Sequence, residues 1–173
     1  MGLTDKRVAV LVENFYEEME VWYPIYRLRE EGVKVSTVGP GRASSYKGKH
    51  GYEVPEDLSI AKVKPNQFDG VIVPGGYAPD HMRRTPAIVQ FVREIFQHKH
   101  PVGAICHGPW VLASAGVLKG KRCTCFFAIK DDVVNAGATY VDREVVRDGN
   151  LITSRTPADL PAFMRAYLAA LAE

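Results

Sequence analysis

The sequence lacks the features that would assign it to a nucleic-acid-binding, membrane or exported class of protein. The chain has no large excess of charge of either sign, because its 22 Lys and Arg residues nearly balance its 20 Asp and Glu residues, and the net charge is +2. A balance this close predicts neither nucleic acid nor an anionic membrane as a partner. Near its start the chain has one apolar run, at residues 8–12. This run is too short for a membrane span or a signal-peptide core.

Cysteine is scarce, and the three present are Cys106, Cys123 and Cys125. An odd number of cysteines without an export signal predicts reduced thiols and a cytoplasmic location. Cys123 and Cys125 have no second pair of metal ligands at suitable spacing, so we expect no metal site. The chain also contains no G-x-G-x-x-G or P-loop pattern, and we expect no cofactor.

What the sequence does contain is a regular alternation of apolar runs and helical stretches. Strands are predicted at residues 7–12, 33–38, 68–76 and 101–106, helices at 17–31, 86–98, 108–118 and 156–173, and hairpins near 48–54 and 148–149. Strands that are apolar throughout and alternate with helices favour a parallel sheet covered on both faces. With no repeat or linker in the chain, we expect one α/β domain over residues 1–173.

The apolar run before Cys106 ends in the segment CHGPW, at the predicted turn from a strand to a helix. Sites in open parallel sheets form beyond the carboxyl ends of the strands. A cysteine on such a turn is raised out of the sheet, and the following helix N-terminus lowers a thiol pKa. The sequence pattern therefore leaves two interpretations of Cys106 open with about equal weight, a nucleophile and a buried structural cysteine.

Two polar groups are candidates to act with this thiol. His107 could orient a substrate or transfer protons, although adjacent side chains on a turn tend to point apart, and a structural histidine is the alternative. Several acidic residues lie at the junction after the first strand, where capping of the helix N-terminus explains most of them. Of these, Glu17 is the candidate to reach Cys106 with a raised pKa and to donate a hydrogen bond to a thiolate.

The segment PGGYAPDHMRR follows the third predicted strand. Gly75 and Gly76 allow close approach of the backbone, so their N–H groups could bind an oxyanion, and a simple tight turn is the alternative. Asp80 and the basic residues after it are either a solvated charged face or part of a site or interface.

Together, five segments resemble the ThiJ/PfpI superfamily, most closely its PfpI-type branch. They are ENFYEEMEVWYPIYRLREEG, GKHGYEV, FDGVIVPGGYAPD, AICHGPW and SRTPADLPAFMRA, in this order. The resemblance covers nearly the whole chain. It implies a flavodoxin-like α/β sandwich of the class I glutamine amidotransferase-like type, with a mostly parallel central sheet and helices on both faces.

The resemblance also implies roles for individual residues. Cys106 matches the reactive cysteine, Glu17 the glutamate whose protonated carboxyl group hydrogen-bonds the sulfur, and His107 the adjacent catalytic histidine. Gly75 and Gly76 match glycines whose backbone faces the sulfur.

Relatives of the PfpI type complete the site with a glutamate from a neighbouring subunit. Asp80 stands at that position with a side chain one methylene shorter, which predicts a homo-oligomer, a dimer or a hexamer, with the site near an interface. Some relatives carry a tyrosine where this chain has Phe126.

By resemblance, the expected function is a stress-response enzyme that acts on reactive aldehydes or their adducts, as a glyoxalase or deglycase. Its common step is attack of a thiolate on a carbonyl carbon. The alternatives are a PfpI-type intracellular cysteine peptidase and a non-enzymatic redox sensor or chaperone in which Cys106 is oxidised. A glutamine amidotransferase is excluded, because its triad needs a later histidine and none follows His107.

Overall fold

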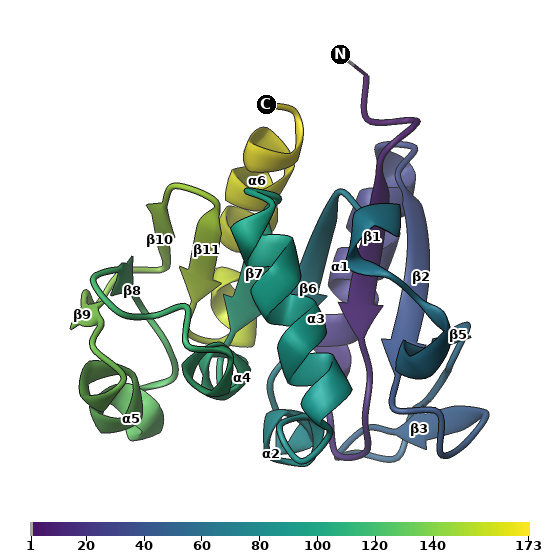
Figure 1. The fold of residues 1–173 in the computed structure, drawn as a ribbon, viewed down its shortest axis with the longest axis horizontal. Coiled ribbons are helices and arrows are strands. Elements are labelled where there is room, and N and C mark those ends of the chain that lie inside the picture. Colours follow the sequence, from purple (N-terminus) through teal and green to yellow (C-terminus); the bar gives the residue numbers. More distant parts are fainter. Residues whose placement is uncertain (1) are drawn as a thin grey trace.

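The computed structural model describes residues 2–173 and contains a central sheet of seven strands (Figure 1). In spatial order they are β10 (Val145–Asp148), β11 (Leu151–Ser154), β7 (Val102–Ile105), β6 (Gly70–Val73), β1 (Arg7–Leu11), β2 (Lys34–Gly39) and β5 (Leu58–Ser59). Neighbouring strands are parallel except β10, which is antiparallel to β11. The five strands from β11 to β2 have the flavodoxin-like order, which confirms the predicted fold class.

Helices cover both faces of this sheet (Figure 1). The pair α1 (Glu18–Glu30) and α6 (Leu160–Leu171) packs on one face, and the pair α3 (Pro86–Gln97) and α4 (Pro109–Ala115) packs on the other. The short helices are α2 (Ala78–Met82) and α5 (Lys130–Asn135). Outside the main sheet, β3 (Ser45–Lys47) pairs with β4 (Glu53–Pro55), and β8 (Arg122–Cys123) pairs with β9 (Thr139–Tyr140). Within residues 2–173, no helix has both the length and the apolar character to cross a bilayer.

The first helix shows how sequence spacing positions a functional group. Its buried residues recur at the helical period and are Glu20, Val21, Pro24, Ile25 and Leu28, whereas Met19, Tyr23 and Tyr26 are exposed. A carboxyl group therefore lies in the otherwise apolar stripe that packs on the sheet. The helix ends before Gly32, whose φ of 80° is the expected left-handed conformation.

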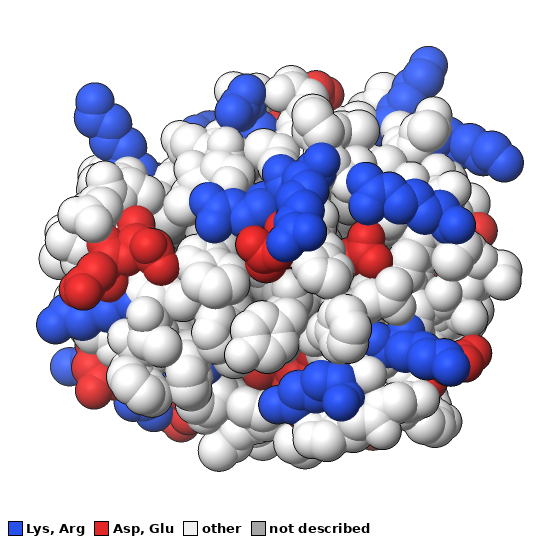
Figure 2. All heavy atoms as spheres, turned by 90° about the horizontal axis from the view of Figure 1, so that it is seen from below, with Lys and Arg blue, Asp and Glu red and all other residues white. Residues whose placement is uncertain are grey.

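Strands β1, β6 and β7 all have their carboxyl ends at one edge of the sheet, the lower edge in Figure 1. The N- and C-termini lie at the opposite edge. Figure 2 views the molecule from the side of the carboxyl ends, where Lys and Arg side chains surround a largely uncharged central area. The segments predicted to carry chemistry emerge at this edge.

Candidate active site

Cys106 lies on the turn between β7 and α4 with a left-handed backbone, at φ 61°. A residue other than glycine in this region costs about 1–3 kcal/mol, and such residues cluster at functional sites. The Cys106 N–H donates to the carbonyl of Ser154, and the Cys106 carbonyl accepts from the N–H of Phe126. These bonds to two other segments hold the strained turn in place.

Three groups approach the sulfur from the protein. His107 Nδ1 lies 3.2 Å from Cys106 Sγ, although we expected adjacent side chains to point apart. The left-handed backbone of Cys106 explains the difference, because it turns the side chain back toward its neighbour. The backbone N–H groups of Gly76 and His107 also hydrogen-bond the sulfur and lower its pKa. These two N–H groups would stabilise negative charge on Sγ.

The carboxyl group next to this sulfur belongs to Glu20. Its Oε2 accepts a 2.7 Å hydrogen bond from the N–H of Gly75, and the carboxyl group affects the pKa of the Cys106 thiol. Glu17, which we expected in this role, instead has its carboxylate 2.5 Å from Lys49 Nζ. The sequence prediction is corrected from Glu17 to Glu20, because Glu20 faces the sheet in the first turn of α1, whereas Glu17 precedes that helix.

We expected the N–H groups of both Gly75 and Gly76 to be available to bind an oxyanion, but the two have different partners. The Gly76 N–H faces the sulfur, whereas the Gly75 N–H binds Glu20. A Cβ on Gly75 would lie 2.6 Å from both Cys106 Cβ and Glu20 Oε2, so only glycine leaves room for this contact. Gly76 has a φ of 68°, which also favours glycine.

Burial dominates the protonation of the Glu20–Cys106 pair. It raises the pKa of Glu20 to about 8, with a further increase from the charge of Glu17, so Glu20 holds its proton at neutral pH. Burial, followed by the charge of an ionised Glu20, raises the pKa of Cys106 to about 12. We expected the helix N-terminus to lower that pKa, and burial outweighs it. While Glu20 is protonated its charge is absent, and only burial opposes the two N–H groups at the sulfur.

Aromatic side chains fix the orientation of His107. Its ring stacks on Phe126 at 5.0 Å between centroids, meets Trp110 edge-on at 5.0 Å, and lies 6.5 Å from Tyr77. Burial, and then the charge of Lys49, lower its pKa. His107 is therefore neutral at neutral pH and able to accept a proton.

Asp80 lies in α2, a helix that the sequence did not predict, and forms an ion pair with Arg84. Its side chain is 41% exposed. Within the single described chain it does not join the other candidate residues, so its expected role across a subunit interface stays a prediction.

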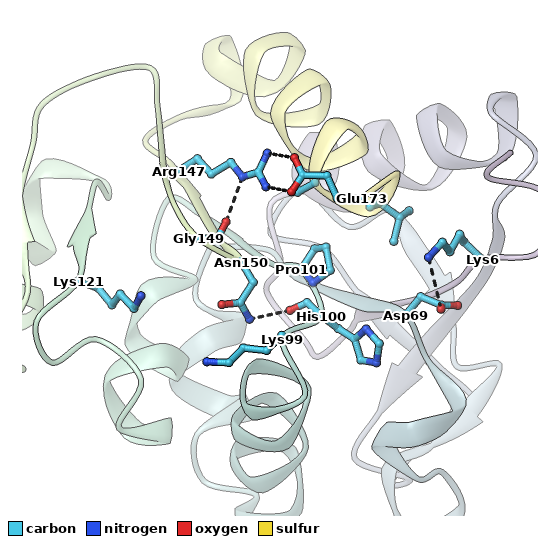
Figure 3. Close-up of a pocket in the computed structure, with 12 residues that line it drawn as sticks. Lys6, Asp69, Lys99, His100, Pro101, Lys121, Arg147, Gly149, Asn150 and Glu173 are labelled. Carbon is cyan, nitrogen blue, oxygen red and sulfur yellow. Dashed lines mark hydrogen bonds and ion pairs between the residues drawn. The ribbon is translucent and has the colours of Figure 1, made fainter. Parts of the chain in front are cut away.

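Glu20, Cys106, His107 and Gly76 line one cavity of about 300 Å³, together with Glu17, Lys49, Tyr77, Phe126, Thr156 and Pro157. Another cavity, of about 370 Å³, lies at the opposite edge of the sheet, near the amino ends of the strands (Figure 3). There Arg147 binds Glu173 and Lys6 faces Asp69, so its charges are largely paired (Figure 3). Since no cysteine lines this second cavity, the cavity at Cys106 is the candidate active site.

One group of potential metal ligands comes together among residues 2–173, namely Glu17, Glu18 and His50. Lys49 already pairs with Glu17, and His50 Nδ1 lies 3.0 Å from Glu18. These interactions within the protein account for the cluster.

The chain matches the DJ-1/PfpI family model over residues 6–170. This protein belongs to the DJ-1/PfpI family. A deglycase of Pyrococcus horikoshii is 46% identical over 162 residues, which cover 94% of this chain and 97% of the relative. A Bacillus subtilis protein named as a candidate cysteine protease is 41% identical over 163 residues, 94% and 96% of the two chains. The family resemblance predicted from the five segments is therefore confirmed.

A solved structure agrees with this assignment. A two-domain protein of Anabaena variabilis, which contains a DJ-1/ThiJ/PfpI-like and a ferritin-like domain, superposes with a TM-score of 0.95 at 43% identity. The match covers 97% of this chain and 48% of that one. The fold of this family thus extends over nearly the whole described chain.

Proposed function

We propose that this protein is a cysteine-dependent enzyme that converts reactive 2-oxoaldehydes, or their adducts on amines and thiols, into 2-hydroxy acids as part of a stress response. The observation that carries this proposal is the surrounding of Cys106 Sγ, with two backbone N–H groups, a protonated Glu20 and the neutral His107 Nδ1 at 3.2 Å. The name of the Pyrococcus relative, a deglycase, agrees with it.

In the first step, the Cys106 thiol loses its proton to His107, and the sulfur attacks the aldehyde carbon. A carbon–sulfur bond forms as the carbonyl π bond breaks, His107 returns the proton to the carbonyl oxygen, which becomes a hydroxyl group, and the product is a hemithioacetal. When the substrate is an adduct, the amine or thiol leaves from the same carbon and takes a proton with it. Glu20 Oε2 accepts from Gly75, so Oε1 is the atom that can carry the proton toward the sulfur.

The second step moves hydrogen within the bound substrate. A base removes the proton from the carbon attached to sulfur, and a proton is returned to the neighbouring ketone carbon. The first carbon is thereby oxidised to a thioester and the second reduced to an alcohol, so no external oxidant is needed. His107 can act as this base because its lowered pKa leaves the ring neutral and free to accept a proton.

Water then hydrolyses the thioester, and the 2-hydroxy acid and the free Cys106 thiol are released. For methylglyoxal, the sum is addition of one water to give lactate.

The test is lactate formation from methylglyoxal by the wild type, by Cys106→Ala and by Cys123→Ala. We expect Cys106→Ala to lose the activity and Cys123→Ala to keep it, because Cys123 is buried away from the cavity. Full activity in Cys106→Ala would contradict the proposal.

A second candidate function is a cysteine peptidase, and the short distance between Cys106 and His107 favours it. No hydrogen bond from within residues 2–173 reaches His107 Nε2 to orient the ring as a peptidase triad does. We propose that Asp80 of a neighbouring subunit supplies that contact in a homo-oligomer. Turnover of peptide substrates, lost in Asp80→Asn together with Cys106→Ala, would favour the peptidase.

A further inference from the structure

Phe15 lies in a tight turn between β1 and α1 with a left-handed backbone, at φ 64°. Glycine or asparagine is the usual residue in this conformation, and a bulky side chain there is a rare outlier. Among residues 2–173, the other non-glycine residues at positive φ are Lys99 and Cys106. Lys99 is explained as a left-handed cap after α3, and Cys106 is the candidate nucleophile. Phe15 follows no helix, so its conformation needs another reason.

Hydrogen bonds on both sides of Phe15 hold this turn in place. The Phe15 N–H donates to the Lys47 carbonyl at 2.7 Å, and the Phe15 carbonyl accepts from the Tyr77 N–H at 2.8 Å. The side chain is 52% exposed, and its ring meets the His81 ring edge-on at 5.6 Å between centroids. Phe15 therefore contacts the rest of the protein mainly through its backbone.

The segment that begins at Phe15 lies against the turn between β6 and α2. Tyr16 forms an antiparallel bridge with Gly76, and the Glu17 N–H donates to the Gly75 carbonyl at 3.4 Å. A Cβ on Gly76 would lie 2.4 Å from the Phe15 carbonyl oxygen, so the two backbones leave no room for a side chain between them. A change in the backbone of Phe15 would therefore be transmitted to Gly76.

The turn between β6 and α2 also provides a hydrogen bond to the candidate nucleophile. One peptide group joins Gly75 to Gly76. Its carbonyl accepts from the Glu17 N–H, whereas its own N–H donates to Cys106 Sγ. The N–H of the next peptide group donates to the Phe15 carbonyl. Contacts with the segment that begins at Phe15 thus fix the direction of the Gly76 N–H.

We propose that Phe15 is a positioning residue for Cys106. Its left-handed backbone directs the Phe15 carbonyl at the Tyr77 N–H and thereby keeps the Gly76 N–H on Cys106 Sγ, where it stabilises the thiolate. This contribution comes from the backbone conformation of Phe15 and does not require the aromatic ring.

Two substitutions at Phe15 separate the backbone from the ring. Phe15→Asn and Phe15→Val both remove the ring, but asparagine adopts the left-handed conformation readily, whereas a β-branched residue strongly disfavours it. The measurement is the rate at which iodoacetamide modifies Cys106 between pH 6 and pH 9, from mass spectrometry of its peptide. The thiolate sulfur displaces iodide, so this rate follows the amount of thiolate. No turnover is needed, so the outcome is independent of the proposed function.

We expect Phe15→Asn to react at the wild-type rate at each pH. Phe15→Val should react about tenfold more slowly, the order of effect of losing one hydrogen bond to a charged group. If the valine variant does not fold, Phe15→Ala takes its place, with an expected fall of about threefold because alanine disfavours the left-handed conformation less. Wild-type rates in all variants would overturn the proposal. An equal loss in Phe15→Asn and Phe15→Val would also overturn it, because the ring would then be the required group.

Lys99→Asn and Lys99→Val are the control pair. Lys99 has the same conformation, at φ 65°, but it lines the cavity at the opposite edge of the sheet. Thermal unfolding should show that Lys99→Val and Phe15→Val both lose stability, because the backbone penalty is the same. We expect the labelling rate of Cys106 to stay unchanged in both Lys99 variants. A fall in Lys99→Val as large as that in Phe15→Val would show that lowered stability alone slows Cys106, and would overturn the proposal.

Discussion

The carboxyl group of Glu20 and the side chain of Cys106 approach the same face of Gly75. A methyl group on that glycine would contact both at 2.6 Å. The two side chains can lie this close to Gly75 only because that residue has a hydrogen atom in place of a Cβ.

Glu20→Gln tests whether the proton of this carboxyl group matters. The amide keeps the shape and can still accept from Gly75, but it cannot exchange a proton with the sulfur. We expect kcat/KM for methylglyoxal to fall by about a hundredfold, within the usual range for an acid–base group. Glu17→Gln is the control, and a larger loss in that variant than in Glu20→Gln would restore Glu17 to the role that the sequence predicted.

The raised pKa of Glu20 also predicts how stability depends on pH. An unfolded glutamate ionises near its ordinary pKa of 4.5, whereas the folded protein keeps the proton up to about pH 8. Between these values the folded state binds more protons, so the Glu20 contribution to the free energy of unfolding decreases as pH rises. The limiting slope is about 1.4 kcal/mol per pH unit.

Urea unfolding of wild type and Glu20→Gln at pH 5, 6.5 and 8 measures this contribution. The difference between the two proteins isolates Glu20 from other titrating groups. We expect Glu20→Gln to gain stability relative to the wild type as pH rises. A difference that is constant over this range would contradict the raised pKa.

Gly75→Ala should reduce both stability and activity. The added methyl group would displace Glu20 or Cys106, at a cost of about 1–3 kcal/mol for overpacking. Gly103→Ala is a matched control, because its methyl group would lie 2.9 Å from Phe163 and Tyr167, which do not line the active-site cavity. Thermal unfolding and kcat are measured on both variants. We expect both to be destabilised, and only Gly75→Ala to lose kcat in its folded fraction.

Iodoacetamide should modify Cys106 faster than Cys123 or Cys125. Burial raises the pKa of all three thiols, to about 12, 11 and 12 in that order. Cys106 is 8% exposed and the other two are fully buried, and only Cys106 has N–H groups at its sulfur that lower its pKa. Peptide mass spectrometry after stoichiometric labelling gives the three rates. Equal rates would contradict a special environment at Cys106.

Much of the fold could be predicted because the pattern is repetitive. Continuous apolar runs identified β1, β6 and β7, the β-branched residues of 33–38 identified β2, and the Asp148-Gly149 turn identified the β10–β11 hairpin. The two-residue strands β5 and β9 and the five-residue helix α2 were missed. Such short elements are fixed by contacts with the rest of the structure, and local sequence carries little signal for them.

The sequence located the segments that form the site, but it did not show which side chains of those segments come into contact, because tertiary packing determines those contacts. The apolar run before Cys106 placed it on a strand-to-helix turn, and the resemblance of the five segments then favoured it as the nucleophile. Glu20 was missed because four acidic residues lie close together, and the start of a helix explains acidic residues in general. Its helical spacing from Val21, Pro24 and Leu28 places Glu20 on the buried face of α1, and this spacing could have identified it from the sequence. The contact between His107 and Cys106 depends on a left-handed φ that no residue type announces.

The position of both chain ends has a practical consequence. Because they lie at the edge of the sheet opposite the candidate site (Figure 1), an affinity tag or a fused reporter at either end would stay clear of Cys106. The N-terminal position is the better choice for attachment. Glu173 forms an ion pair with Arg147, which an extension at the C-terminus would crowd.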